Sequence, residues 1–344
     1  MRIVSFERVR RDAESAPRAS ALGAGGRILE EPLGRGGHRL GALLGEDVVD
    51  LNLALALRLA LDDAPAPEAE ADSRIPADPI AFLAHGERAL DAAHQALDFA
   101  RGALDRYDAP DLRSASAVLS RRDVRLHAPV PRPGKVIGVA RNYPAHARER
   151  GDAAPPVEPV LFVKASSAVI GPEDEIVVPA AVSEPDYEGE LAVVIGRPAR
   201  EVSADDALAC VAGYTVANDV TARDFQNARG QRFLGKSCDT FAPLGPALVT
   251  ADEVPDPQDL SLVTRVSGEL VQSARTKEMH FPVAEIIAFA SRLMRLVPGD
   301  VILTGTPAGV GAAREPARWL RDGDVVEVEI ERVGRLSNYV RRAP

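Results

Sequence analysis

Apolar and polar residues alternate over many short stretches in the last two thirds of the chain. Alternation with a period of two is typical of strands, and the stretches are separated by Gly, Pro and Asp. A Ser-Gly pair at 267–268 lies between two such stretches and predicts a hairpin turn. The predicted strands cover residues 135–140, 159–164, 175–178, 190–195, 213–220, 247–250, 260–266, 269–273, 301–304 and 324–330.

A helical period appears clearly once in this part of the chain, over residues 282–297. Its apolar positions Ile286, Ile287, Ala290 and Leu293 lie on one stripe, and Pro298-Gly299 ends the helix. Because strands are frequent and do not alternate regularly with helices, we predict an α+β fold that is mainly β and mainly antiparallel.

The first part of the chain has a different pattern. We predict short strands at 3–6, 38–44 and 47–51, the first two joined by a glycine-rich stretch at 23–37, and a helix over 79–99. Residues 62–78 are rich in Ala, Pro and acids and predict a solvated loop. The Pro- and Gly-rich segment near residue 130 predicts a boundary between a smaller N-terminal α+β domain, 1–128, and a catalytic domain, 129–344.

Composition excludes several classes of protein. The 344 residues include 51 acidic and 41 basic ones, so a formal charge of −10 argues against a nucleic-acid partner. The longest apolar run, 48–61, contains polar residues and is shorter than the ~20 residues of a membrane span. The N-terminus lacks the apolar segment of a secretory signal, and the only cysteines, Cys210 and Cys238, form no CxxC pair. We therefore expect a cytoplasmic protein with no membrane partner.

Two acids on one strand stand out chemically. Glu188 and Glu190 are two residues apart, so their side chains share one face of a strand that enters an apolar run. Burial of two like charges is costly unless a bound cation or an Arg/Lys pair compensates. With Asp219 at the end of a later strand, three carboxylates suit a hard cation such as Mg²⁺, Mn²⁺ or Ca²⁺. From the residues alone, a solvated acidic strand face, with Asp219 as a helix cap, is the competing interpretation.

Three further segments carry polar residues with a potential role in chemistry. A short helix from Pro144 would place His146 and Glu149 one turn apart, as a general base with its orienting carboxylate. Arg223 and Gln226 are also one turn apart, and a glycine-rich turn at 303–311 could bring backbone amides to a ligand. An incidental surface pair and an ordinary tight turn are the alternatives.

Residues 230–237 match the phosphate-binding pattern GxxxxGK[ST] letter by letter. That pattern works only between an apolar strand and a helix, and neither context is predicted here. We therefore do not predict nucleotide binding, and Lys236 remains a cation presented by a loop, for which a solvated surface lysine is the alternative.

Taken together, these segments resemble the fumarylacetoacetate hydrolase family over residues 133–340. The motifs RNYPAHARE, EPVLFVK, DYEGELAVVIG, AGYTVANDVTARDFQ, LGKSCDTFAPLGP and LTGTPAGVG occur in the family's order. The resemblance implies a β-rich roll, usually dimeric, with Mg²⁺ or Mn²⁺ held by Glu188, Glu190 and Asp219 in a site that Ca²⁺ can also occupy. It implies that His146 with Glu149 activates water on a lid and that Lys236 and Gln226 contact substrate. Matching motifs also contain the substrate-binding candidates Arg223, Tyr143, Lys164 and Thr306.

The resemblance also implies a reaction. We expect hydrolysis of a C–C bond in a 2,4-dioxo acid such as an acylpyruvate or fumarylpyruvate: water activated by His146 attacks the 4-carbonyl, and an enolate leaves. The alternatives on the same site are a 2-oxo acid decarboxylase, a tautomerase or a 2-hydroxydienoate isomerase. A metal-stabilised binding module without turnover is the non-enzymatic alternative.

Overall fold

The computed structural model describes residues 1–9, 38–105, 109–151, 154–228 and 232–344. The chain divides into two compact units, Met1–Leu126 and His127–Pro344. The glycine-rich stretch at 23–37 and the first two residues of the GxxxxGK[ST] match lie outside the described residues. No helix in the described ranges combines the length and the apolar character needed to cross a membrane.

The first unit contains a small antiparallel sheet with the strand order β4-β3-β2-β1, and β5 pairs with β1. Val4 and Phe6 on β1 are fully buried, so the sheet has an apolar core face. The three strands predicted in this region are confirmed. The strands are β1 (Arg2–Arg8), β2 (Arg39–Leu44), β3 (Asp47–Asp50), β4 (Val118–Ser120) and β5 (Val124–His127).

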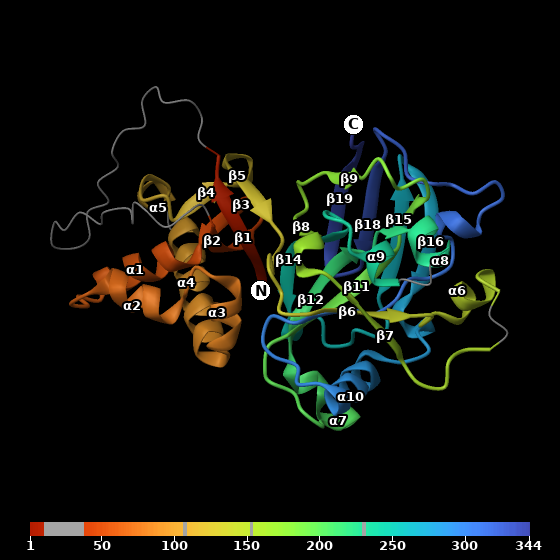
Figure 1. Cartoon of the computed structure of the whole chain (residues 1–344). Helices are drawn as coiled ribbons and strands as arrows, with labels where there is room; N and C mark the ends of the chain where they lie inside the picture. Colours follow the sequence, from red (N-terminus) through yellow and green to blue (C-terminus); the bar gives the residue numbers. More distant parts are fainter. Residues whose placement is uncertain (10–37, 106–108, 152–153, 229–231) are drawn as a thin grey trace. The chain divides into compact units, whose positions relative to one another are not determined.

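In the described part of the first unit, five α-helices accompany the sheet, and two predictions are wrong there. The predicted loop at 62–78 contains α2, which begins at Pro67 and buries Ala71, because Pro is favoured at the first helical position. The predicted single helix at 79–99 is two helices, because Gly86 adopts a left-handed φ of 60° between them. The helices are α1 (Leu51–Leu61), α2 (Pro67–Arg74), α3 (Pro79–Ala84), α4 (Glu87–Asp105) and α5 (Ala109–Ser114), and Figure 1 shows α1 beside α2 and α4.

The second unit is built on a mixed sheet with the order β14-β12-β11-β17-β6-β7. All neighbours are antiparallel except β17 and β6, which are parallel, as are β8 and β14. Every residue of the central strand β11 is buried, which agrees with its continuous apolar sequence. The strands are β6 (Val136–Ala140), β7 (Val160–Lys164), β8 (Val169–Ile170), β11 (Gly189–Ile195), β12 (Val211–Asn218), β14 (Ala242–Thr250) and β17 (Val301–Leu303).

A second sheet of this unit has the order β16-β15-β18-β19-β9. The predicted hairpin is confirmed: Ser267 and Gly268 both have positive φ, and Val266 pairs with Glu269. The long strand β19 was not predicted, because charged residues interrupt its alternation. The strands are β9 (Ile176–Val178), β15 (Ser261–Val266), β16 (Glu269–Arg275), β18 (Val325–Ile330) and β19 (Gly334–Arg342), and β10 (Pro185–Asp186) pairs separately with β13 (Thr221–Ala222).

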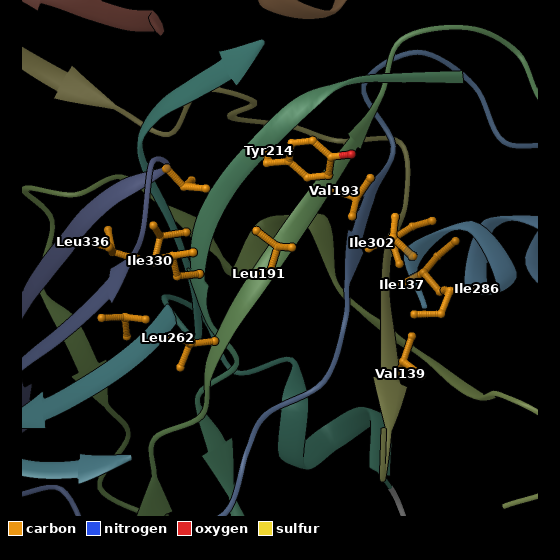
Figure 2. Packing of buried hydrophobic residues seen from close by; sticks show 14 of the residues in the cluster. Ile137, Val139, Leu191, Val193, Tyr214, Leu262, Ile286, Ile302, Ile330 and Leu336 are labelled. Atoms are coloured by element: carbon orange, nitrogen blue, oxygen red, sulfur yellow. The ribbon is translucent and has the colours of Figure 1, made fainter. Parts of the chain in front are cut away.

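Apolar side chains of the two sheets pack against one another in the core of the second unit. Figure 2 shows Leu191 of β11 facing Leu262, Ile330 and Leu336 of the other sheet. Fully burying each such side chain contributes about 1.5–3 kcal/mol. Helix α10 (Val283–Leu293) covers the sheet with Ile286, beside Ile137 and Ile302 (Figure 2). The predicted fold class, α+β and mainly β, is confirmed.

Short helices connect the strands of the second unit and present polar residues. They are α6 (Pro144–Glu149), α7 (Ala204–Ala207), α8 (Arg223–Ala228) and α9 (Arg232–Lys236). Helix α9 contains the end of the GxxxxGK[ST] match, so Lys236 lies at a helix C-terminus rather than before a helix.

Candidate active site

Three buried carboxylates lie together where β11 begins and β12 ends. Gly189 of β11 pairs with Asn218 of β12, and the amide of Asp219 donates to the carbonyl of Glu188 at 2.8 Å. This pairing brings Asp219 beside Glu188 and Glu190, and one oxygen of each carboxylate lies within 4.8 Å of the others. The side chain of Asp219 binds two lysines and caps no helix.

Three buried cations surround these acids. Nζ of Lys236 donates to Glu188 Oε2 at 2.7 Å and also to Asp219 Oδ2. Nζ of Lys164 donates to Asp219 Oδ1 at 2.5 Å, and Nη2 of Arg223 donates to Glu188 Oε1 at 2.5 Å. The acids Glu188 and Asp219 are therefore each paired with cations.

Glu190 has no such cation. Among the described residues, its carboxylate accepts one hydrogen bond, from the amide of Gly305 at 2.6 Å. Burial, Asp219 and Glu188 raise the pKa of Glu190 well above its usual range. For Glu188, burial acts in the same direction, but Lys236 and Arg223 hold its pKa well below the usual range. A divalent cation at the three carboxylates would supply the charge that Glu190 lacks, so the donor set fits Mg²⁺ or Mn²⁺.

The two lysines respond differently to the same acids. Burial acts to lower the pKa of Lys236, but Asp219 and Glu188 raise it above its usual value. Burial lowers the pKa of Lys164, and Asp219 only partly offsets this. Lys236 is therefore the more strongly held cation of the pair.

Asp186 orients the side chain of Arg223. Its Nε donates to Asp186 Oδ2 at 2.8 Å, and its Nη1 donates to Gln226 Oε1 at 3.0 Å. Asp186 also accepts the amides of Gly311 and Ala312. Because Oε1 of Gln226 is engaged, the side-chain NH₂ group of Gln226 remains as its donor toward the cavity.

The predicted helix after Pro144 is present as α6 and carries a histidine–carboxylate pair. Nδ1 of His146 lies 2.8 Å from Oε1 of Glu149. The other oxygen of Glu149 accepts the amide of Gly309 at 2.9 Å. This leaves Nε2 of His146 as the ring nitrogen available to a substrate.

The glycine-rich turn at 303–311 provides the amides expected from the sequence. Gly305 donates to Glu190 and Gly309 to Glu149, and both glycines have positive φ. Thr306 is held between the carbonyl of Gly189, to which it donates, and the side-chain amide of Gln272, from which it accepts. Gln272 also accepts the amide of Gly189.

A cavity of about 340 Å³ joins most of these groups. Seven of the predicted site residues line it: His146, Glu188, Glu190, Arg223, Gln226, Lys236 and Thr306. Asp219, Lys164 and Glu149 lie directly behind them through the hydrogen bonds above. The ring of Phe162 forms one wall, 5.2 Å from Nζ of Lys236, and it passes over Gly138, where a Cβ would meet it at 2.2 Å.

The remaining predicted residue, Tyr143, lines a different cavity of about 240 Å³ on the other side of α6, with Arg148 and Glu278. Its hydroxyl is buried and has no hydrogen-bond partner among the described residues. Burial, Glu190 and Glu278 raise its pKa above the usual range. Tyr143 is not among the residues that line the first cavity, so the structure does not bring it together with the other predicted site residues.

Several residues that shape the site were not predicted from the sequence. Asn142 ties the end of β6 to the turn after β17, because its side chain donates to Thr304 and exchanges hydrogen bonds with Phe281. Gln272 lies in a strand with ordinary alternation, and no local pattern marks it. Three arginines also line the cavity: Arg141, Arg150 and Arg232. Their only signal in the sequence is their position in or next to the family-matching motifs RNYPAHARE and LGKSCDTFAPLGP.

The chain is similar to proteins of known description. The family model described as fumarylacetoacetate (FAA) hydrolase, C-terminal, matches residues 135–341. The human protein "Oxaloacetate tautomerase FAHD2A, mitochondrial" is 45% identical over 271 residues, which cover 78% of this chain and 81% of that one. "Oxaloacetate tautomerase YisK" of Bacillus subtilis is 41% identical over 269 residues, covering 77% and 87%.

A solved structure is similar over nearly the whole chain. It is "Fumarylacetoacetate hydrolase (EaFAH)" from psychrophilic Exiguobacterium antarcticum, with 34% identity and a TM-score of 0.70. The match covers 99% of this chain and 100% of that one, so both units have counterparts in a single known protein.

Proposed function

The chain belongs to the fumarylacetoacetate hydrolase family, and from this premise we propose that it catalyses the keto–enol tautomerisation of a small 2-oxo diacid such as oxaloacetate. The two oxaloacetate tautomerases that are 41–45% identical support this reaction over the hydrolysis expected from the sequence. The observation that carries the proposal is the pairing of His146 with Glu149 in the cavity that also holds the acids Glu188 and Glu190.

The acid cluster would hold the 2-oxo acid end of the substrate. Glu188, Glu190 and Asp219 would hold Mg²⁺ or Mn²⁺, which polarises a bound 2-oxo group and stabilises negative charge that develops on its oxygen. Lys236 and the side-chain amide of Gln226 donate toward the same oxygen. Arg223 keeps Gln226 oriented and is itself fixed by Asp186.

The lid helix α6 would move the proton. In the keto-to-enol direction, Nε2 of His146 removes a proton from carbon 3, and the C3–H electron pair forms the C2–C3 double bond. The same proton is then delivered to the oxygen on carbon 2, which completes the enol without any external reactant. Glu149 stabilises the positively charged imidazole between the two steps, and Gly309 holds Glu149 in place.

A stopped-flow assay tests the proposal. Enol oxaloacetate is mixed with protein and Mg²⁺, and the loss of enol absorbance is compared with buffer containing Mg²⁺ alone. We expect a rate that is first order in protein, with pyruvate formation unchanged from the buffer value. A loss of enol no faster than in buffer would rule out the tautomerase.

Hydrolysis of a 2,4-dioxo acid is the second candidate. One comparison favours it: the structure similar over the whole chain is described as a fumarylacetoacetate hydrolase. The same base, His146, would deprotonate a water molecule for attack on the 4-carbonyl. Acylpyruvates and fumarylpyruvate assayed with Mg²⁺ and Mn²⁺ separate the two, because only hydrolysis yields two carboxylic or keto fragments.

The expected homodimer and cytoplasmic location belong to the same proposal. Light scattering of the purified chain would test the first, with a mass of twice 36.6 kDa expected. The human relative is described as mitochondrial, so the compartment needs its own test by fractionation of the source cells.

A further inference from the structure

Two arginines of the cavity wall have no part in the chemistry above. Arg150 directly follows the lid helix α6, and Arg232 begins α9. Both line the cavity that contains the acid cluster and His146. Within the described part of the chain, neither guanidinium has a hydrogen-bonding or ion-pairing partner, although both are half-buried.

The inner cations of the same cavity are in the opposite situation. Arg223 donates to Asp186, Glu188 and Gln226, and Lys236 donates to Glu188 and Asp219. Arg223 and two of the three N–H donors of Lys236 are thus engaged by protein groups, and the third donor of Lys236 is the one assigned above to the 2-oxo oxygen. Among the described residues of the cavity wall, Arg150 and Arg232 therefore have N–H groups that can bind an anion entering from solvent.

Arg232 is also oriented. Its guanidinium carbon lies 5.9 Å from the centroid of Phe162, the ring that forms a wall of the cavity. A guanidinium over the face of an aromatic ring is attracted by the ring without using its N–H groups as hydrogen-bond donors. An arginine in this geometry is suited to a planar carboxylate.

The charge of the site indicates how many carboxylates a ligand should carry. Four buried acids, namely Asp186 and the three metal-ligand candidates, face three buried cations, so a divalent ion would leave the inner site with one positive charge. One substrate carboxylate would balance that charge. Arg150 and Arg232, together with Arg141, would then still face the cavity as cations.

We propose that Arg150 and Arg232 bind the second carboxylate of a dicarboxylic substrate and so determine specificity for 2-oxo diacids over 2-oxo monoacids. This inference rests on the proposed tautomerase function. A carboxylate held by both residues would also connect α6, which carries His146, with α9, which carries Lys236. Binding of the distal carboxylate would thus help to position the base.

Two matched pairs of ligands test the proposal. Oxaloacetate and its 4-methyl ester differ in the charge at the distal end and share the 2-oxo acid end. Malate and malate 4-methyl ester provide the same comparison without turnover, and their binding in the presence of Mg²⁺ is measured by calorimetry. The variants are Arg150→Gln and Arg232→Gln. The control is Arg148→Gln, because Arg148 is on the same helix but lines the other cavity.

For the unmodified protein and R148Q we expect a preference for each diacid over its ester. In R150Q and R232Q, kcat/KM for oxaloacetate and affinity for malate should fall about 10–100-fold, as for loss of a charged hydrogen bond, with both esters unchanged. Equal losses for diacid and ester, or a preference preserved in both variants, would overturn the proposal. If the protein turns over neither oxaloacetate form while malate binding follows the expected pattern, the tautomerase fails and the carboxylate site stands.

Discussion

At the scale of single residues, the proposed proton transfer depends on a short chain of hydrogen bonds that runs from a backbone amide to the proposed base, His146. Gly309 donates to Glu149, and Glu149 binds Nδ1 of His146. A base oriented in this way has one tautomer and one direction, which is what general base catalysis requires. Glu149 is not among the residues that line the cavity of about 340 Å³, so its effect on the proposed catalysis should act through His146.

Because Glu149 acts through His146, the effects of substituting the two residues on kcat should not add. We expect His146→Ala to lower kcat for oxaloacetate about 10²–10⁴-fold, because the base is lost. Glu149→Gln should cost less, and the double variant should be no slower than H146A alone. Kinetics of the three variants, with Mg²⁺ affinity measured in parallel, provide the test. A further loss in the double variant would show that Glu149 acts independently of His146.

The pair His146 and Glu149 could be predicted from sequence, because residues three apart on a helix face one another whatever the rest of the fold does. The same holds for Glu188 and Glu190 on a strand. Gln272 could not be predicted, because its partners Gly189 and Thr306 are brought to it only by the tertiary structure. Local periodicity contains no information about such distant hydrogen bonds.

One residue outside the site should give the protein a measurable pH dependence. Asp324 accepts from Ser267, from both terminal nitrogens of Arg318 and from the amide of Arg321. Burial alone would raise its pKa, but these donors hold the pKa below its usual range. A carboxyl with a depressed folded-state pKa stabilises the fold above its unfolded value, near 3.9, and this contribution disappears as the pH falls further.

We therefore expect Asp324→Asn to lower the free energy of unfolding by about 1–3 kcal/mol at pH 7, because charged hydrogen bonds are lost. The difference from the unmodified protein should shrink as the pH falls below about 4. Urea unfolding of both proteins between pH 7 and pH values below about 4 tests this expectation. Asp205→Asn, at an exposed position, is the control. A difference that stays constant with pH would contradict an ionised Asp324.

At the scale of elements, the turn after β17 does more than connect strands. Gly309 has a φ of 108°, and a Cβ there would lie 2.0 Å from the carbonyl oxygen of Val271. Its amide must keep this position to bind Glu149. The turn therefore couples the second sheet, through β16, to helix α6.

Gly309→Ala should accordingly lower both the stability of the protein and its kcat. Backbone strain and the clash with Val271 should together destabilise the protein by about 2–5 kcal/mol, and displacement of the amide should lower kcat as E149Q does. Gly323 is the matched control, because its φ is 84° but nothing lies within 4 Å of a Cβ. G323A should cost about 1–2 kcal/mol and leave kcat unchanged. Equal free energies of unfolding for G309A and G323A would show that the contact with Val271 is relieved by a local shift.

The helices and strands also show where the periodicity of apolar residues is sufficient to predict an element and where it is not. Helix α10 could be predicted because Ile286, Ile287 and Ala290 of its apolar stripe are buried, although Leu293 at its end is exposed. Helix α2 was taken for a loop because only Pro67 and Ala71 are buried, and two small side chains make no visible stripe. Strand β19 was missed for a similar reason: it ends in charged residues, and pairing with β18 and β9 rather than its own pattern holds it in the sheet.

At the scale of the whole molecule, the acid cluster is a local instability that a metal ion should relieve. All three carboxylates belong to the second unit, where β11 begins and β12 ends, and among the described residues no cation forms an ion pair with the buried Glu190. Uncompensated burial of a charge costs several kcal/mol, so the metal-free protein should be less stable than its core implies.

The single tryptophan makes this measurable, because Trp319 also lies in the second unit and its fluorescence reports unfolding there. Mg²⁺ at about 100 times its Kd should add about 2.7 kcal/mol, a shift of roughly 5–10 °C in the melting temperature. Glu190→Gln keeps an acceptor for the amide of Gly305 but removes the charge, so we expect no Mg²⁺ shift and an unchanged or higher melting temperature without metal. The exposed Glu329→Gln should behave like the unmodified protein. If Mg²⁺ raises the melting temperature of E190Q as much as that of the unmodified protein, the ion binds elsewhere. If E190Q melts at a lower temperature than the unmodified protein without metal, the buried charge of Glu190 is already compensated by the protein.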